Sequence, residues 1–145
     1  MKINTRVRYG LRAILRIAEG YGGPPISIST ISNEQGISGK YLEQVISPLR
    51  RAGLVTSQKG VKGGYTLARK PEEITLWHVI QALDSHPHLV ECVDNPGNCN
   101  KTDSCAAFTV WQLLDQRMQE FWNGFNLAEL MTITEKRARS VGFDI

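Results

Sequence analysis

The sequence lacks the features that mark most membrane, secreted and catalytic proteins. No stretch approaches the ~18 uninterrupted apolar residues of a membrane span, and no long apolar run follows the charged N-terminus. Aromatic residues make up only 8% of the chain. We find no hydrolase motif, phosphate-binding loop or pairing of a nucleophile with a base. We therefore expect a cytoplasmic protein that does not enter a membrane and is not an enzyme.

Cysteine is also scarce, at three in 145 residues. Three thiols cannot all pair within one molecule, and the reducing cytoplasm disfavours disulfides, so we expect free thiols or metal ligands. A chain of this length supports one compact core with an accessory element. Its composition, 41% hydrophobic and 21% charged, is typical of a folded protein.

The net charge of +3 is modest, but the charges are unevenly distributed. Residues 40–70 hold seven basic side chains and one acid, whereas residues 71–131 hold nine acids and two basic side chains. This asymmetry indicates that the first of these segments binds a polyanion and that the second does not.

Hydrophobic periodicity predicts three helices in the first part of the chain. Asn4 or Thr5 can cap the first helix, and Ser27 can cap a short second one. Ser38 can cap a third helix, which contains Pro48 and should bend or tighten there. A capped helix, a glycine-containing turn and a second capped helix form the helix-turn-helix pattern.

Two short strands, 54–56 and 65–67, follow the third predicted helix, and a glycine-rich turn with basic residues at its tip joins them. We interpret this hairpin as a wing. The predicted fold class is therefore mostly α with a small β-wing: a winged helix-turn-helix domain plus a long dimerisation helix. Residues 27–68 are predicted to bind double-stranded DNA.

The first turns of a recognition helix should carry the base contacts, because such a helix enters the major groove N-terminus first. Gln44 can bind adenine through two hydrogen bonds, Tyr41 offers a hydroxyl and a ring, and Glu43 can accept from a cytosine amino group. A carboxylate also repels phosphates, so Glu43 can act by rejecting wrong sequences or conditions. The predicted DNA contacts are Ser38, Lys40, Tyr41, Glu43, Gln44, Arg50, Arg51, Lys59, Gly60 and Lys62, with Arg6, Arg8 and Arg69 as further phosphate contacts. Taken singly, each basic residue could instead be a solvated surface charge.

The second half of the chain reads as accessory elements. A DNA-binding domain over 1–83 is followed by a polar, turn-rich segment, 84–105, which carries the cysteines. A long helix and a short capped helix, 106–131, come next, and a polar tail, 132–145, is expected to be mobile.

Apolar residues of the long helix recur at spacings of four and three, which is the pattern of a helix pair. We predict a homodimer interface there; the alternative is a helix packed on the wing domain of the same chain. The interface residues are Ala107, Trp111, Leu114, Met118 and Phe121.

Cys92, Cys99 and Cys105 lie in the polar segment, with six and five residues between them. These gaps are wider than those of most zinc knuckles, so an iron–sulfur cluster fits better than zinc. Inert free thiols, a redox thiol switch and a zinc site are the alternatives. The spacing does not identify a fourth ligand; the candidates are a residue of the other subunit, a small thiol, or Asp94, Asp103, His86 and His88.

Several short stretches together carry a family resemblance: Arg8-Tyr9, Gly36-Ile37-Ser38, Tyr41-Leu42-Glu43-Gln44, Gly53-Leu54-Val55, Gly63-Gly64-Tyr65 with Leu67, and the three cysteines followed by a tryptophan-bearing helix. With these residues the chain resembles the iron-sulfur cluster regulator (IscR) family of winged-helix repressors, up to about Met131. The resemblance implies a homodimer and a cluster, usually two-iron (2Fe-2S), on the three cysteines. It also implies control of cluster-assembly or stress genes. Tyr41, Glu43 and Gln44 carry over as base-reading positions and Lys59 as the wing-tip contact.

Two residues depart from the family's pattern. Its best-known members have a histidine as fourth ligand three residues after the last cysteine, where this chain has Phe108. They commonly carry arginine at the wing tip, where this chain has Lys59, which cannot make the planar two-bond contact of arginine. Related members sense nitric oxide with a four-iron (4Fe-4S) cluster, or respond to a partner protein without a cluster. The alternative functions are therefore a regulator controlled by thiol oxidation or by a partner protein without a cluster, and a nitric-oxide sensor with a four-iron cluster.

Overall fold

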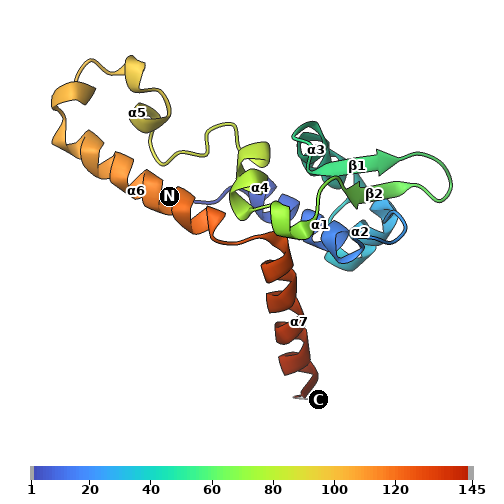
Figure 1. Cartoon of the computed structure of the whole chain (residues 1–145). Coiled ribbons are helices and arrows are strands. Elements are labelled where there is room, and N and C mark those ends of the chain that lie inside the picture. Colours follow the sequence, from blue (N-terminus) through green and yellow to red (C-terminus); the bar gives the residue numbers. More distant parts are fainter. Residues whose placement is uncertain (1, 144–145) are drawn as a thin grey trace.

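The computed structural model describes residues 2–143. The chain is mostly helical with one small antiparallel sheet (Figure 1), which confirms the predicted fold class. The elements in order are α1 (Thr5–Glu19), α2 (Ile28–Gln35), α3 (Gly39–Arg51), β1 (Val55–Gln58), β2 (Gly64–Leu67), η1 (Pro71–Glu73), α4 (Leu76–Leu83), α5 (Glu91–Asp94), η2 (Pro96–Asn98), η3 (Thr102–Ser104), α6 (Ala106–Asn123) and α7 (Leu127–Phe143).

Side-chain caps start the helices of the DNA-binding domain where the sequence predicts them. Asn4, rather than Thr5, caps α1 and accepts from the Val7 N–H at 2.8 Å. Ser27 and Ser38 accept from backbone N–H groups three residues further on, at 3.1 and 3.2 Å. Each cap satisfies a donor that the first helical turn leaves unpaired, which contributes about 1 kcal/mol per helix.

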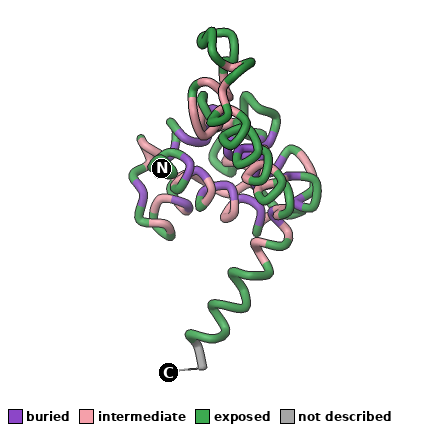
Figure 2. The backbone as a smooth tube through the Cα atoms, turned by 90° about the vertical axis from the view of Figure 1, so that its left-hand side faces the viewer, coloured by how far each residue is buried: buried purple, intermediate pink, exposed green. Residues whose placement is uncertain are grey.

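The core forms around α1, which contacts α2, α3, α4, α7 and β2. One face of each amphipathic helix supplies it, and each fully buried aliphatic side chain stabilises the fold by about 1.5–3 kcal/mol. Figure 2 shows the buried backbone gathered in the middle of the molecule. The largest side chains with less than 2% exposure include Ile14, Ile17, Ile31, Leu42, Ile46, Leu49, Leu54, Ile74, Leu83 and Leu127.

The second half of the chain extends away from this core (Figure 1). The segment after α4 carries α5, η2 and η3 and returns into α6, which contacts only α4 and α5 among the more extensive pairings of described elements. Within residues 2–143, no helix combines the length and apolar composition that crossing a bilayer requires.

The prediction of a short last helix was wrong in length. Asn126 and Glu129 form the predicted capping box, each side chain accepting from the other residue's N–H at 2.9 and 3.0 Å. The helix then continues to Phe143, because residues 135–139 all favour helix apart from any packing. From Thr132 to Val141 every residue is exposed, as the lower part of Figure 2 shows. Residues 144 and 145 of the predicted tail lie outside the described residues.

Candidate nucleic-acid interface and cysteine loop

Helix α3, the predicted recognition helix, has a buried core face and an exposed outer face. The buried residues recur at helical spacing and place the intervening side chains in solvent. Lys40, Glu43 and Gln44 are exposed on that outer face, and Tyr41 is half-buried. The residues that hold α3 against the core are Leu42, Val45, Ile46, Pro48 and Leu49.

A shallow depression of about 470 Å³ lies on the outer face of α3. Arg6 of α1 and Arg51 at the end of α3 line it together with Lys40, Glu43 and Gln44. The fold thus brings the Gln44 amide and three of the basic side chains predicted to contact DNA onto one surface. In the described part of the chain Glu43 forms no ion pair with these cations, so its carboxylate stays available to discriminate between ligands.

An aromatic contact holds Tyr41 in place. The Tyr41 ring meets the ring of Tyr9 edge-on, with centroids 5.7 Å apart and an interplanar angle of 84°. The guanidinium groups of Arg8 and Arg12 lie 5.9 and 5.5 Å from the Tyr9 centroid. Such contacts limit the freedom of the Tyr41 side chain and tie the outer face of α3 to α1.

The wing is the hairpin of β1 and β2, paired antiparallel from Val55 with Leu67 to Gln58 with Gly64. The predicted tip residues Lys59, Gly60 and Lys62 are all exposed. Gly64 has φ +158°, and a Cβ there would lie 2.3 Å from the Ile26 carbonyl oxygen, so only glycine allows this close approach.

Arginines at the end of α3 extend the basic surface toward the wing. Arg50 donates to the Ser57 hydroxyl of β1 at 3.1 Å. Arg51 donates to the Ser47 hydroxyl one turn earlier at 3.2 Å. Both side chains remain exposed, and the hydrogen bonds orient cations that a flexible side chain would otherwise spread over many positions.

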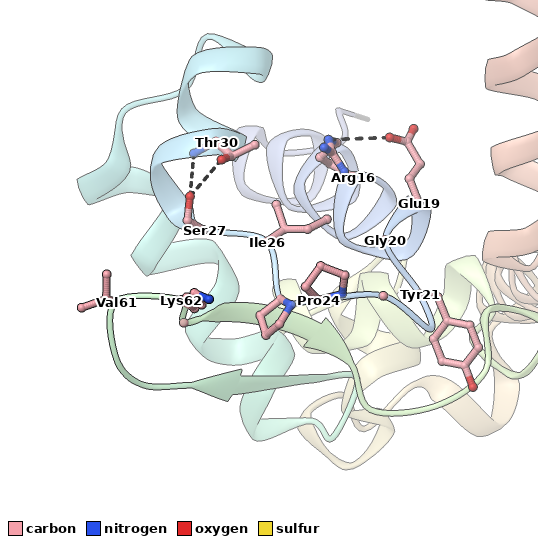
Figure 3. Close-up of a pocket in the computed structure, with 13 residues that line it drawn as sticks. Arg16, Glu19, Gly20, Tyr21, Pro24, Ile26, Ser27, Thr30, Val61 and Lys62 are labelled. Carbon is pink, nitrogen blue, oxygen red and sulfur yellow. Dashed lines mark hydrogen bonds and ion pairs between the residues drawn. The ribbon is translucent and has the colours of Figure 1, made fainter.

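A groove of about 680 Å³ runs between the end of α1, the start of α2 and the wing tip (Figure 3). Lys62 and Val61 close it on the wing side, and Val61 is fully exposed. Several of its other polar groups already have partners: Ser27 bonds Thr30, and Arg16 forms ion pairs with Glu34 and Glu19. The groove is therefore a basic-rimmed surface without an activated nucleophile.

The three cysteines lie on one connected stretch between α4 and α6. Cys92 is half-buried in α5, and Cys99 is exposed after η2. Cys105 caps α6, where its sulfur accepts from the Phe108 N–H at 3.4 Å. All three are free thiols.

The donor set of this stretch fits an iron–sulfur cluster in its chemistry. Three unpaired, at least partly accessible thiols are the ligands that iron–sulfur clusters use. Within residues 2–143, however, no three cysteine, histidine or acidic side chains are already gathered as a metal centre. A cluster would therefore need the stretch from Cys92 to Cys105 to close.

Two of the predicted fourth-ligand candidates are engaged with acids. His86 Nδ1 lies 2.8 Å from Asp94 Oδ2, and the His88 Nδ1 lies 2.9 Å from Asp115 Oδ2. Asp115 also accepts from the Leu89 N–H at 3.1 Å and from the Gln119 amide at 2.6 Å. Burial alone would raise the pKa of Asp115, but the hydrogen bonds from His88, Leu89 and Gln119 outweigh it and hold that pKa below its ordinary value.

Sequence reasoning missed Asp115, the one buried charged residue among the described side chains. Its partner His88 lies 27 residues earlier in the chain, so no local pattern connects the two. The available signal was weak: Asp115 is the first acid of α6 and directly follows Leu113 and Leu114, but Gln116 and Arg117 after it are polar as well. Asp103, another candidate, is simply exposed in η3.

The apolar row of α6 faces mostly away from the rest of the chain. Trp111, Leu114 and Phe121 are 39%, 43% and 56% exposed, and Ala107 is exposed as well. Met118 is half-buried and lines a cavity with Ile80 of α4, so the chain itself covers that position. Sequence reasoning missed two further exposed apolar residues on this helix, Val110 and Leu113.

Residues 3–133, with both the wing and the cysteine stretch, match Rrf2, described as an iron-dependent transcriptional regulator. The chain belongs to the Rrf2 family. Its relatives are transcriptional regulators and not enzymes, as the sequence predicts. The transcriptional regulator IscR of Aliivibrio salmonicida is 40% identical over 135 residues, covering 93% of this chain and 80% of that protein.

Two solved structures show the same architecture. The IscR of T. potens superimposes with a TM-score of 0.77 at 33% identity, over 94% of this chain and 90% of that one. The structure of CymR, the global cysteine regulator of B. subtilis, gives a TM-score of 0.76 at 32% identity, over 92% and 98%. The predicted resemblance to IscR is confirmed. CymR, which is described as a cysteine regulator, has the same fold.

Proposed function

We propose that this Rrf2-family regulator is a homodimeric repressor that binds a specific operator and responds to an iron–sulfur cluster held by Cys92, Cys99 and Cys105. The observation that carries the proposal is the joining of two features in one chain. A capped recognition helix presents reading side chains to solvent, and three free thiols lie on the stretch that leads directly into α6.

The operator is read by the outer face of α3. Gln44 and Tyr41 offer hydrogen-bonding groups to base edges in the major groove. The Glu43 carboxylate accepts from a cytosine amino group and disfavours other sequences, because it repels phosphates. Ser38 and Lys40 stand at the N-terminal end of the helix, the end that enters the groove first. These residues supply sequence preference.

Cations around that face supply affinity without sequence preference. Arg50 contacts β1 of the wing, and Arg51 lies beside the outer face of α3. The tip residues Lys59, Gly60 and Lys62 reach the neighbouring groove or backbone. Each neutralised phosphate releases counterions, so binding should weaken steeply as salt rises.

Dimerisation follows from the exposed apolar row of α6. Its side chains Ala107, Trp111, Leu114 and Phe121 suit the same surface of a second copy, with Met118 at the edge, because a twofold interface is self-complementary. Two recognition helices related in this way read half-sites of a pseudo-palindromic operator about one helical turn apart.

The cysteine stretch is the sensing part. When bound, a cluster supplies iron–thiolate bonds that join three points of the chain. Cys92 in α5, Cys99 and the α6 cap Cys105 would hold it, and we propose a two-iron cluster with a four-iron one as the alternative. Phe108 cannot be a ligand, so the fourth position falls to another group. Binding or loss of the cluster would move the stretch from Cys92 to Cys105 and, through the cap Cys105, the start of α6. The dimer interface on α6 would shift with it.

The deciding experiment is anaerobic purification and reconstitution of the full chain. We expect a brown protein with thiolate-to-iron absorption, containing iron and sulfide in equal amounts. The absorption and the iron should disappear in Cys92→Ala/Cys99→Ala/Cys105→Ala and persist in Ser104→Ala, a matched change in the same stretch. A colourless wild-type protein without iron or sulfide after reconstitution would contradict the cluster.

Regulation by thiols or by a partner protein without a cluster is the second candidate. It is favoured by the free, ungathered state of the cysteines among the described residues. In that case operator affinity is unchanged by reconstitution but shifts on oxidation of the thiols, which fluorescence anisotropy with a labelled operator separates from the cluster response.

A further inference from the structure

Side chains of the types that bind metal ions also gather at the start of the cysteine stretch, and this group contains no thiol. A cavity of about 340 Å³ opens between residues 86–90 and α5. Two imidazoles and two carboxylates line it: His86, His88, Glu91 and Asp94. Imidazole and carboxylate together are the ligands of many divalent transition-metal sites in proteins.

The ring of His88 is held in the orientation of a metal ligand. Its Nδ1 lies 2.9 Å from the buried carboxylate of Asp115, which also accepts from the Leu89 N–H. Because an ionised carboxylate only accepts, Nδ1 must donate, and in the neutral ring Nε2 then carries the lone pair. A carboxylate that fixes a histidine through its other nitrogen is the usual support of a metal-ligating imidazole.

The free nitrogen of His88 faces an oxygen across a gap suited to an ion. Nε2 lies 3.8 Å from Asp94 Oδ1, too far for a hydrogen bond. Ligand atoms about 2.1 Å from a tetrahedral zinc ion lie about 3.4 Å from each other. A small movement of Asp94 would therefore let His88 Nε2 and Asp94 Oδ1 bind the same ion.

The surrounding charges favour a cation. Asp94, Asp84 and Glu91 all raise the pKa of His86, and the largest cause is the hydrogen bond that the His86 ring donates to Asp94. In the described part of the chain no lysine or arginine forms an ion pair with any of these acids. Lys2 lines a neighbouring cavity with Asp84, His86 and His88 but is not among the residues that line this one. The acids therefore dominate the field at the cavity, which favours a cation.

We propose that His86, His88 and Asp94 bind a divalent transition-metal ion of the zinc type, with Glu91 beside it and Asp115 as the residue that positions His88. No three such side chains within residues 2–143 converge in the ligand-free arrangement. His86, 75% exposed, must turn its ring to complete the site. The ion would join α5, which carries Cys92, to α6 through Asp115. The proposal does not depend on the iron–sulfur cluster.

The test uses the full chain with Cys92→Ser, Cys99→Ser and Cys105→Ser, so that no thiol can bind metal. Titration with Zn²⁺ in a calorimeter should give one ion per chain. Co²⁺ should give d–d absorption without a thiolate charge-transfer band. In this background His86→Ala and His88→Gln should each weaken Zn²⁺ binding at least about tenfold, and Asp115→Asn about tenfold.

Asp103→Asn is the matched control, because it removes an acid of the same stretch that does not line the cavity. It should leave Zn²⁺ affinity unchanged. His86→Ala alters an exposed side chain and keeps the test valid if another variant fails to fold, which circular dichroism reports. The proposal is overturned if the thiol-free chain binds no stoichiometric Zn²⁺, or if it binds with equal affinity after both histidine changes. Neither result bears on the iron and sulfide content of the wild-type protein.

Discussion

The most quantitative consequence of the structure concerns Asp115→Asn. Asp115 accepts from His88, Leu89 and Gln119 in a site that is 3% exposed. An asparagine can accept on one oxygen only, and its amide group would face donors. Net contributions of hydrogen bonds to a buried charged group are about 1.5–3 kcal/mol each. Part of the loss is recovered when the Gln119 amide rotates and presents its oxygen to the new asparagine. We therefore expect the free energy of unfolding to fall by about 2–3 kcal/mol.

This loss should depend on pH in a definite direction. The folded-state pKa of Asp115 is lowered, so its stabilisation is present above the pKa of the unfolded chain, about 4, and is lost as pH falls through the folded pKa. The difference between wild type and Asp115→Asn should therefore be complete at neutral pH and shrink below about pH 4. At neutral pH the melting temperature should fall by about 5–10 °C.

Urea and thermal unfolding followed by far-ultraviolet circular dichroism measure both effects, at one protein concentration because a dimer's stability depends on it. Glu120→Gln is the control: this carboxylate lies on the same helix, is 53% exposed and makes only solvent-exposed contacts among the described residues, with Arg117 and Gln116. Its removal should change stability by less than about 0.5 kcal/mol. Equal stability of wild type and Asp115→Asn at neutral pH would refute the reasoning, as would an undiminished difference at about pH 3.

Three further predictions address the DNA interface, the dimer and the wing. Gln44→Ala should relax base preference at one operator position by about 1–3 kcal/mol, whereas Lys62→Ala should weaken specific and random DNA alike and lower the salt slope by about one unit. Fluorescence anisotropy over a salt series checks both, and equal losses on both DNAs for Gln44→Ala would contradict its role. Leu114→Glu puts a charge into the exposed apolar row of α6 and should yield monomers in sedimentation; an intact dimer would argue against that interface. Gly64→Ala would force a methyl group against a backbone oxygen 2.3 Å away and should cost about 2 kcal/mol or more in urea unfolding, while Gly97→Ala, which meets open space, should be close to neutral.

The DNA-binding half was largely predictable because its signals are local. Ser27 and Ser38 cap helices through bonds to residues three positions away, so the sequence shows cap and helix together. The apolar stripe of α3 turned Lys40 and Gln44 outward as its period required. The ends of the predicted strands differ from the observed ones by at most two residues, since hairpin boundaries depend on pairing as well as on propensity.

The accessory half was less predictable because its contacts join distant positions. Proximity in sequence drew attention to His86 and His88, and the partner of His86, Asp94, is itself local. The partner of His88 was set by the return of the chain through α6, which carries Asp115. The length of α7 was missed because a polar segment without an apolar stripe gives no packing signal, although its residues favour helix.

Residue order alone was sufficient for the winged helix-turn-helix, the outer face of its recognition helix and the presence of three unpaired thiols, because caps, period and composition act within a few residues of each other. Tertiary structure was needed to bring Arg6 and Arg51 beside Gln44, to set Tyr41 against Tyr9, and to bury Asp115 under His88. Those arrangements depend on how helices pack, and packing is decided by the whole core at once rather than by any short segment.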